Sequence, residues 1–167
     1  MADSFFQVGK IKSKLEELIP PEVARFIPVY NAFFETMIRY VDPDVSVMKV
    51  DMVDALPKGD QVTQVMVWED GLVTCLSECD GGLLEVANGY GCTDMLVLNE
   101  DALDAVGEFL NCSNGMFVSE LSKQGTFLEL LPPEAEPLEE PLVENAICKM
   151  MVKARGRNLF FTVAGLA

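Results

Sequence analysis

Apolar residues recur at helical spacing along the first forty residues of the chain. From Ser4 to Ile19 they lie three or four positions apart, which predicts an amphipathic helix. Pro20 and Pro21 end it, because the residue before a proline disfavours helical dihedral angles. A second helical pattern runs from Val23 to Val41, and Pro28 either starts a helix inside it or kinks it. The apolar stripe of this second helix is typical of a core. The first helix can pack either on its own domain or on a partner subunit.

From Val45 onward the pattern changes to short apolar runs typical of strands. Asp70-Gly71 lies between two such runs and is a strong hairpin signal, because both residues tolerate positive φ. Pro132 to Asn145 is rich in proline and glutamate, which predicts a stiff, solvated loop. We expect about six strands, at Val45–Val53, Gln61–Trp68, Leu72–Ser77, Thr126–Leu131, Ala146–Lys153 and Leu159–Val163.

Two further helices are expected between the strands. A short one covers about Leu83–Asn88, and a long one runs from Glu100 to about Gln124, with Asn99 as its N-cap and Gly125 as its stop. Strands in hairpin-like succession, with helices before and between them, predict an α+β domain with an antiparallel sheet. The residues of the long helix that should face the core are Leu103, Val106, Leu110, Phe117 and Leu121.

Composition narrows the possible partners and the compartment. The chain has 12 basic and 27 acidic residues among 167, a net charge of −15, so nucleic acid and anionic membranes are poor partners. It shows neither the pattern of a signal peptide nor an apolar run of the roughly 20 residues that span a bilayer. The odd number of cysteines, five, favours reduced thiols, and we expect a cytoplasmic protein.

The cysteines themselves are expected to be buried structural thiols. Cys75 and Cys79 lie four positions apart on an apparent strand, so both should face the same way. The chain has no histidine and its cysteine spacing is irregular, which argues against a zinc site. The absence of histidine also excludes Ser-His and Cys-His nucleophile pairs.

The most informative feature is a polar stripe on the long helix. Asp104, Glu108 and Asn111 lie on one helical face, and no Lys or Arg within this stretch offsets the two carboxylates. Like charges four positions apart cost a helix roughly 0.2–0.5 kcal/mol. Gly107 and Gly115 weaken the helix further, and we expect them to flatten the surface so that another protein's backbone can approach.

The spacing D-x3-E-x2-N, followed by Gly115, resembles the signature of the CheC/CheX/FliY chemotaxis phosphatases. The resemblance is tight from Asp101 to Pro133 and loose from Ile27 to the C-terminus, which divides the chain into a helical extension (1–26) and a CheX-like domain (27–167). CheC-like proteins carry two copies of the motif. Here Ile38 stands where the second Asn would follow Glu35, which points to the single-site CheX type.

The resemblance implies an α+β fold of the CheC/CheX kind and hydrolysis of the aspartyl phosphate of a CheY-type response regulator in two-component signalling. Asn111 would orient the attacking water, because a carboxamide can donate or accept a hydrogen bond without adding charge. Glu108, which completes the expected catalytic pair with Asn111, would form a salt bridge to a regulator lysine, and Asp104 and Gly115 would support docking. No cofactor is expected on this chain, because the regulator would bring the phosphate and Mg2+.

Other interpretations of the stripe stay open. It can be an ordinary solvated face, or the surface of a non-catalytic CheX-like module that binds a response regulator or flagellar-switch protein. It can also be a bystander on a small-molecule or structural module. The exposure of Glu108 and Asn111 tests the docking interpretations, because these residues cannot bind a partner if they are buried. CheX-like proteins form dimers through their sheets, so a homodimer is possible, unless the N-terminal extension covers that edge.

Overall fold

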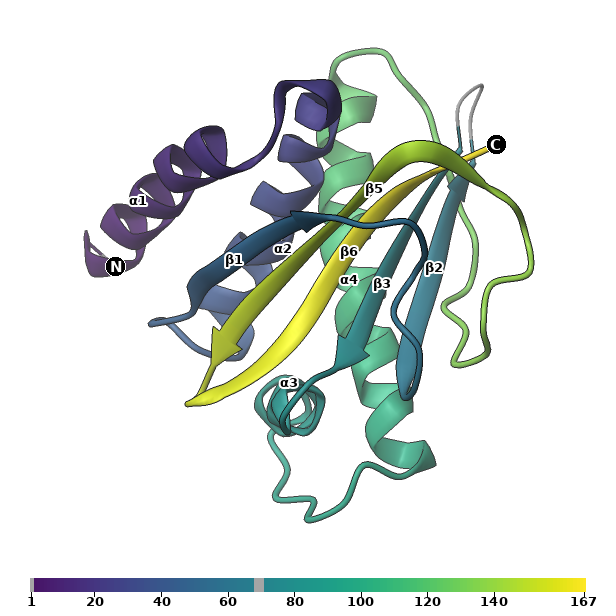
Figure 1. Ribbon diagram of the computed structural model, residues 1–167. Helices are drawn as coiled ribbons and strands as arrows, with labels where there is room; N and C mark the ends of the chain where they lie inside the picture. The colour runs from purple at the N-terminus through teal and green to yellow at the C-terminus, as the bar shows by residue number, and fades with distance from the viewer. Residues whose placement is uncertain (1, 68–70) are drawn as a thin grey trace.

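The computed structural model describes residues 2–67 and 71–167 of the chain. Helices α2 (Ile27–Tyr40) and α4 (Glu100–Lys123) lie against one face of a twisted sheet, and α3 (Gly82–Gly91) closes one end of it (Figure 1). Helix α1 (Ala2–Leu18) packs on α2 beside the outer strand of the sheet. A short 3-10 helix, η1 (Pro21–Phe26), joins α1 to α2. Pro28 lies in the first turn of α2 and starts that helix, which was one of the two alternatives that the sequence left open. Proline is tolerated there because the main-chain N–H groups of a first helical turn have no partner within the helix.

The sheet contains six strands within the described residues, all paired antiparallel in the order β1-β5-β6-β3-β2-β4. This confirms the predicted α+β class. The bounds of the strands are β1 Ser46–Met52, β2 Gln61–Val67, β3 Leu72–Glu78, β4 Glu129–Leu130, β5 Leu142–Ala154 and β6 Arg157–Leu166.

The β2–β3 pair forms the hairpin that the sequence predicted. Its register runs from the Gln61–Ser77 pair to the Met66–Leu72 pair. The turn itself, including Asp70 of the Asp70-Gly71 signal, lies outside the described residues.

Two strands differ in length from the sequence prediction. β4 covers only Glu129–Leu130, because its pairing with β2 is limited to two residue pairs. β5 begins at Leu142, inside the segment predicted as a loop up to Asn145. Leu142 pairs with Leu166, and the register then shifts before Ile147, with Asn145 at φ 57°. Such a bulge interrupts the period-two pattern, so the first half of the strand was not recognisable in the sequence.

The core between the helices and the sheet fixes α4 in place. The ring of Phe33 in α2 stacks on Phe161 of β6 at 4.1 Å between centroids. It also meets Phe109 of α4 edge-on at 5.8 Å. Of the residues predicted to face inward, Leu103 and Leu121 are half-buried at the margin of the core. The fully buried residues of α4 are Ala102, Val106, Gly107, Phe109, Leu110, Ser113, Asn114 and Phe117.

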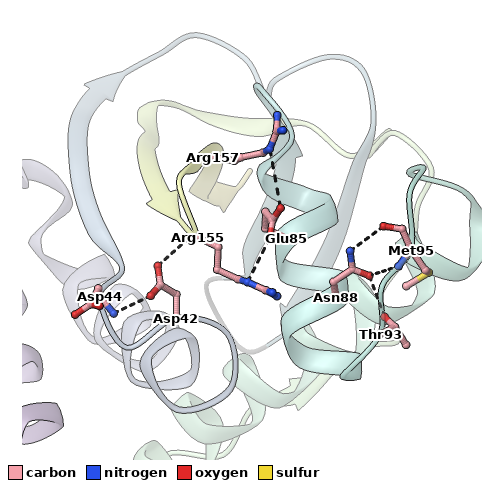
Figure 2. Close-up of polar contacts among 8 residues, drawn as sticks. All are labelled: Asp42, Asp44, Glu85, Asn88, Thr93, Met95, Arg155 and Arg157. Carbon is pink, nitrogen blue, oxygen red and sulfur yellow. Dashed lines mark hydrogen bonds and ion pairs between the residues drawn. The ribbon is translucent and has the colours of Figure 1, made fainter.

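The segment before α4 is held by one asparagine of α3 (Figure 2). The Asn88 side chain donates to the Met95 carbonyl at 2.9 Å and accepts from the Met95 N–H at 2.8 Å and the Thr93 hydroxyl at 3.0 Å. Asn99 then caps α4 as predicted, accepting from the Ala102 N–H at 3.0 Å. These contacts set where α4 begins and therefore where its polar stripe lies. None of the helices in the described residues is both long and apolar enough to cross a membrane.

The same end of the sheet carries a cluster of charges. Glu85 of α3 pairs with Arg155, in the β5–β6 turn, at 3.3 Å and with Arg157, the first residue of β6, at 4.0 Å (Figure 2). Asp42 accepts from the Arg155 N–H at 2.7 Å. These partly exposed pairs join α2, α3 and the β5–β6 turn and add little stability individually.

The cysteines do not follow the expectation that all are buried. Cys75 and Cys148 are buried, but Cys79 and Cys92 are exposed and Cys112 is half-buried. Cys79 follows the last residue of β3, so it does not share the buried face of Cys75. Cys92 is the C-cap of α3, in a left-handed conformation with φ 52°, and its side chain is exposed.

The N-terminal helix packs on its own chain. Ile11 and Leu15 are buried in the same core as the rest of the molecule. Gln7 and Lys14 donate to the main-chain carbonyls of Val45 and Val47, each at 2.9 Å, beside the outer strand β1. The helix therefore contributes both to the core and to covering a sheet edge, where carbonyl groups otherwise lack strand partners. The division at residue 26 stays a prediction.

Candidate functional site

The polar stripe lies on the outer face of α4, which runs behind the sheet in Figure 1. Asp104, Glu108 and Asn111 are all exposed, and Gly115 is half-exposed on the same face. A Cβ atom built on Gly115 would meet no atom of the described residues within 4 Å. The exposure that any docking interpretation requires is therefore present.

A hollow of about 520 Å³ opens beside the centre of this stripe. Glu108 and Asn111 form part of its wall, whereas Asp104 and Gly115 lie one helical turn to either side, outside the lining. The structure thus brings two of the four predicted residues into one concave site. The residues that line the hollow are Tyr90, Glu108, Asn111, Cys112, Leu130, Leu131, Pro132 and Pro133.

The wall opposite α4 is the segment that follows β4. The Leu131 N–H donates to the Val65 carbonyl at 3.0 Å, and the Glu134 N–H donates to the Thr63 carbonyl at 2.8 Å. Both bonds attach the segment to β2, so the wall extends the sheet. The sequence predicted this stretch as the end of a strand and the start of a loop, without relating it to the helix.

Gly107 does not flatten the exposed surface as expected. It is buried, and a Cβ atom there would lie 3.4 Å from Pro133 Cγ. The missing side chain therefore lets Pro133 approach α4 closely on the core side of the hollow. Gly115 keeps the expected role of an open, small position on the helix.

Asn111 is held by a buried glutamine from the sheet. Gln64 of β2 donates from Nε2 to Asn111 Oδ1 at 2.7 Å and to the Leu131 carbonyl at 2.8 Å. The Gln64 side chain is almost completely buried. One amide thus connects the strand, the helix and the opposite wall at the base of the site.

A second amide continues the connection into the core. The Asn114 Nδ2 group donates to Gln64 Oε1 and to Thr74 Oγ1, each at 2.8 Å. Asn114 and Thr74 are both buried. These bonds connect α4 with both strands of the β2–β3 hairpin, whereas the buried Asn114 Oδ1 atom has no hydrogen-bond partner among the described residues.

Gln64, Asn114 and the residues of the opposite wall were not identified from the sequence. Gln64 and Asn114 could have been recognised as polar residues at apolar positions. Gln64 lies between Val62 and Met66 on the inward face of β2, where a lone amide requires a partner. Asn114 follows Asn111 by three positions and points to the buried face of α4. A search for unpaired polar residues at apolar positions would have identified both. Their pairing depends on strand register, which the sequence does not reveal.

Tyr90 and Cys112 complete the rim on the α3 side. Partial burial raises the pKa of the Tyr90 hydroxyl, and the neighbouring Cys112 and Glu108 shift it in the same direction. The hydroxyl therefore stays protonated at neutral pH. It can donate or accept a hydrogen bond at the mouth of the hollow.

Charge at the site is negative. Glu108 and Asp104 form no ion pair with any Lys or Arg of the described residues. In the same part of the chain, no group of three or more potential ligands among Asp, Glu, Cys and His could hold a metal ion. A free carboxylate beside an amide, on an exposed helix, is suited to binding a basic group supplied from outside.

Comparison with known proteins gives no match to a protein-family model and none to a curated protein. Solved structures do match. The chemotaxis protein CheX from Vibrio vulnificus has a TM-score of 0.67 and 19% identity, covering 85% of this chain and 99% of its own. A CheC-like superfamily protein from Shewanella sp. PV-4 has a TM-score of 0.67 and 16% identity, covering 88% of this chain and 99% of its own.

The chain has the fold of the CheX and CheC-like chemotaxis proteins. A third match with this fold is the CheX–CheY-BeF3-Mg+2 complex from Borrelia burgdorferi, with a TM-score of 0.66 and 14% identity, covering 86% of this chain and 98% of that chain. The recognition made from Asp104, Glu108, Asn111 and Gly115 is therefore confirmed for the CheX-like fold. The roles of these four residues stay predictions.

Proposed function

We propose that this protein is a CheX-like phosphatase that hydrolyses the aspartyl phosphate of a CheY-type response regulator. The observation that carries the proposal is the exposed pair Glu108 and Asn111 on the wall of one hollow, with the Asn111 amide held from behind by Gln64. Similarity in fold to a CheX protein solved in complex with CheY supports the choice of partner. All five cysteines are free, which supports a reducing compartment such as the cytoplasm.

The proposed reaction needs positioning more than covalent help. The attacking water forms a new P–O bond, the bond between phosphorus and the aspartyl oxygen breaks, and the water's protons pass to the phosphate product and to solvent. Phosphoryl transfer of this kind depends on in-line geometry and electrostatics. Asn111 contributes a fixed neutral amide at the water's position. Mg2+, bound by the regulator, would neutralise charge on the phosphoryl oxygens.

Glu108 is assigned to docking rather than chemistry. A carboxylate repels a phosphoryl group, but it binds a regulator lysine well through a charge-assisted hydrogen bond. Its exposure and the lack of an internal cation among the described residues leave it free for that contact. Asp104 and Gly115 extend the docking face along the same side of α4.

The test is the Asn111→Ala variant. We expect roughly a 10²-fold loss of accelerated dephosphorylation, because the water loses its fixed partner. Phosphate release from a purified phosphorylated CheY-type regulator measures the rate, and circular dichroism checks the fold. The matched control is Ser119→Ala, an exposed position later on the same helix. Equal rates for Asn111→Ala and wild type, with the fold intact, would sink the assignment.

A further inference from the structure

The hydrogen bonds behind Asn111 determine which way its amide points. The Leu131 main-chain carbonyl can only accept a hydrogen bond, so the Gln64 atom 2.8 Å away from it is the Nε2 donor. Gln64 Oε1 then faces the Asn114 Nδ2 donor, also at 2.8 Å. Both orientations agree, because each places a donor against an acceptor.

The same bonds orient the Asn111 amide. Gln64 Nε2 uses its second proton toward Asn111, so the Asn111 atom at 2.7 Å is the oxygen Oδ1. The Nδ2 group is therefore the part of the amide left free of Gln64, on an exposed residue that lines the hollow. If the Asn111 amide were flipped, its Nδ2 donor would face the Gln64 Nε2 donor. Neither group would then be hydrogen-bonded at that contact, and folded proteins avoid unpaired buried donors.

We propose that Gln64 is a positioning residue that fixes the Asn111 amide with its N–H2 group outward, so that Asn111 acts as a hydrogen-bond donor in the reaction. This inference rests on the proposed phosphatase function. An outward N–H group holds the oxygen of the attacking water, or a phosphoryl oxygen, and takes no proton from it. The donor also offsets the negative potential that Glu108 creates beside the incoming phosphoryl group.

The first test compares two glutamines of the same strand. Gln64→Met keeps the length of the side chain but removes its donors and acceptor. Gln61→Met is the matched control, because Gln61 is also buried on β2, lies on the opposite face, and donates to the Pro57 and Gly59 carbonyls at 3.1 and 3.4 Å. The control therefore loses a similar set of bonds away from the site.

We expect kcat for the phosphorylated regulator to fall roughly 10- to 100-fold in Gln64→Met with KM nearly unchanged, because the docking residues are untouched. Gln61→Met should keep the wild-type kcat. A wild-type kcat in a folded Gln64→Met variant would overturn the inference while leaving the phosphatase proposal in place. Equal losses in both variants would also overturn it, since they would reflect general destabilisation.

The second test addresses the donor itself. In Asn111→Asp, a carboxylate oxygen can still accept from Gln64 Nε2, so the fold should keep its stability, but the outward donor is lost. We expect this variant to be as inactive as Asn111→Ala. Activity close to wild type would show that Asn111 works as an acceptor and would contradict the inference.

A third readout does not depend on activity. In NMR spectra of the full chain, the Gln64 side-chain amide protons should exchange slowly with water, because both are hydrogen-bonded in a buried site. Those of Asn111 should exchange rapidly, because they face the hollow. Slow exchange at Asn111 would contradict the orientation even if the protein proved to have no phosphatase activity, which separates this inference from the proposed function.

Discussion

Tyr30 and Cys75 are buried and do not line the hollow, and burial keeps both in their neutral forms. The Tyr30 hydroxyl donates to the Cys148 carbonyl at 2.6 Å, and burial raises its pKa well above the ordinary value of 10.0. Burial also raises the pKa of the Cys75 thiol from 9.0 to about 12. The charged form of each is penalised because it would lose hydration in the core. Both groups therefore make stability depend on pH in the alkaline range.

Cys75→Ala tests this dependence. The folded-state pKa is raised, so the contribution of Cys75 is fully present below pH 9 and is lost as pH rises toward 12, because only the unfolded chain ionises there. Wild-type stability should fall faster than that of the variant by about 1.4 kcal/mol per pH unit above pH 9. Urea unfolding between pH 8 and 11 measures both. The exposed Cys92→Ala is the control, and parallel curves for wild type and Cys75→Ala would refute the account.

At the scale of elements, two glycines of helices have opposite surroundings. A Cβ on Gly82, at the start of α3, would collide with the Asn158 main-chain carbonyl and lie 2.7 Å from Leu159 Cβ on β6. A Cβ on Gly115 of α4 would meet open space. α3 thus needs a glycine for its close contact with β6, whereas α4 carries one where packing does not require it.

Substitution by alanine at Gly82 and at Gly115 should therefore have opposite effects on the free energy of unfolding. Gly82→Ala should lower the free energy of unfolding by about 1–3 kcal/mol, because main chain has to move. Gly115→Ala should raise it by up to about 1 kcal/mol through helix propensity, and should raise KM if a partner backbone approaches there. Urea denaturation and regulator titrations measure these effects. Destabilisation by Gly115→Ala would contradict the open position.

Periodicity predicted the elements well where one face of an element is buried. The N-cap Asn99 and the β2–β3 pairing follow from local signals, and the structure confirms both. The start of β5 was missed, because the bulge before Ile147 breaks the alternation. The support of Asn111 by Gln64 was missed for another reason: it joins residues 47 positions apart, and only the packed sheet sets that distance.

At the scale of the whole molecule, the N-terminal helix contributes side chains to the main core. Leu15 of α1 has 0% of its surface exposed, whereas Leu18 on the same helix has 37% exposed. Lys12 also pairs with Glu35 of α2 at 3.4 Å. If α1 docks on its own chain as described, these two leucines should differ sharply in their contribution to stability.

Leu15→Ala should lower the free energy of unfolding by about 2–5 kcal/mol through the lost burial and the cavity left behind. Leu18→Ala should change it by about 0.5 kcal/mol or less, as is usual for exposed positions. Thermal or urea unfolding of the full chain gives both values. Similar small effects at the two positions would mean that α1 is not packed on this core in solution.

The central claim is that the chain turns over a phosphorylated regulator instead of only binding it. The most direct measurement follows phosphate release from a phosphorylated CheY-type regulator in the presence of Mg2+ and a large molar deficit of this protein. The account predicts that all of the regulator is dephosphorylated, at a rate proportional to the amount of this protein and well above the spontaneous rate. Release that stays at the spontaneous rate, or stops at one phosphate per molecule of this protein, would contradict it.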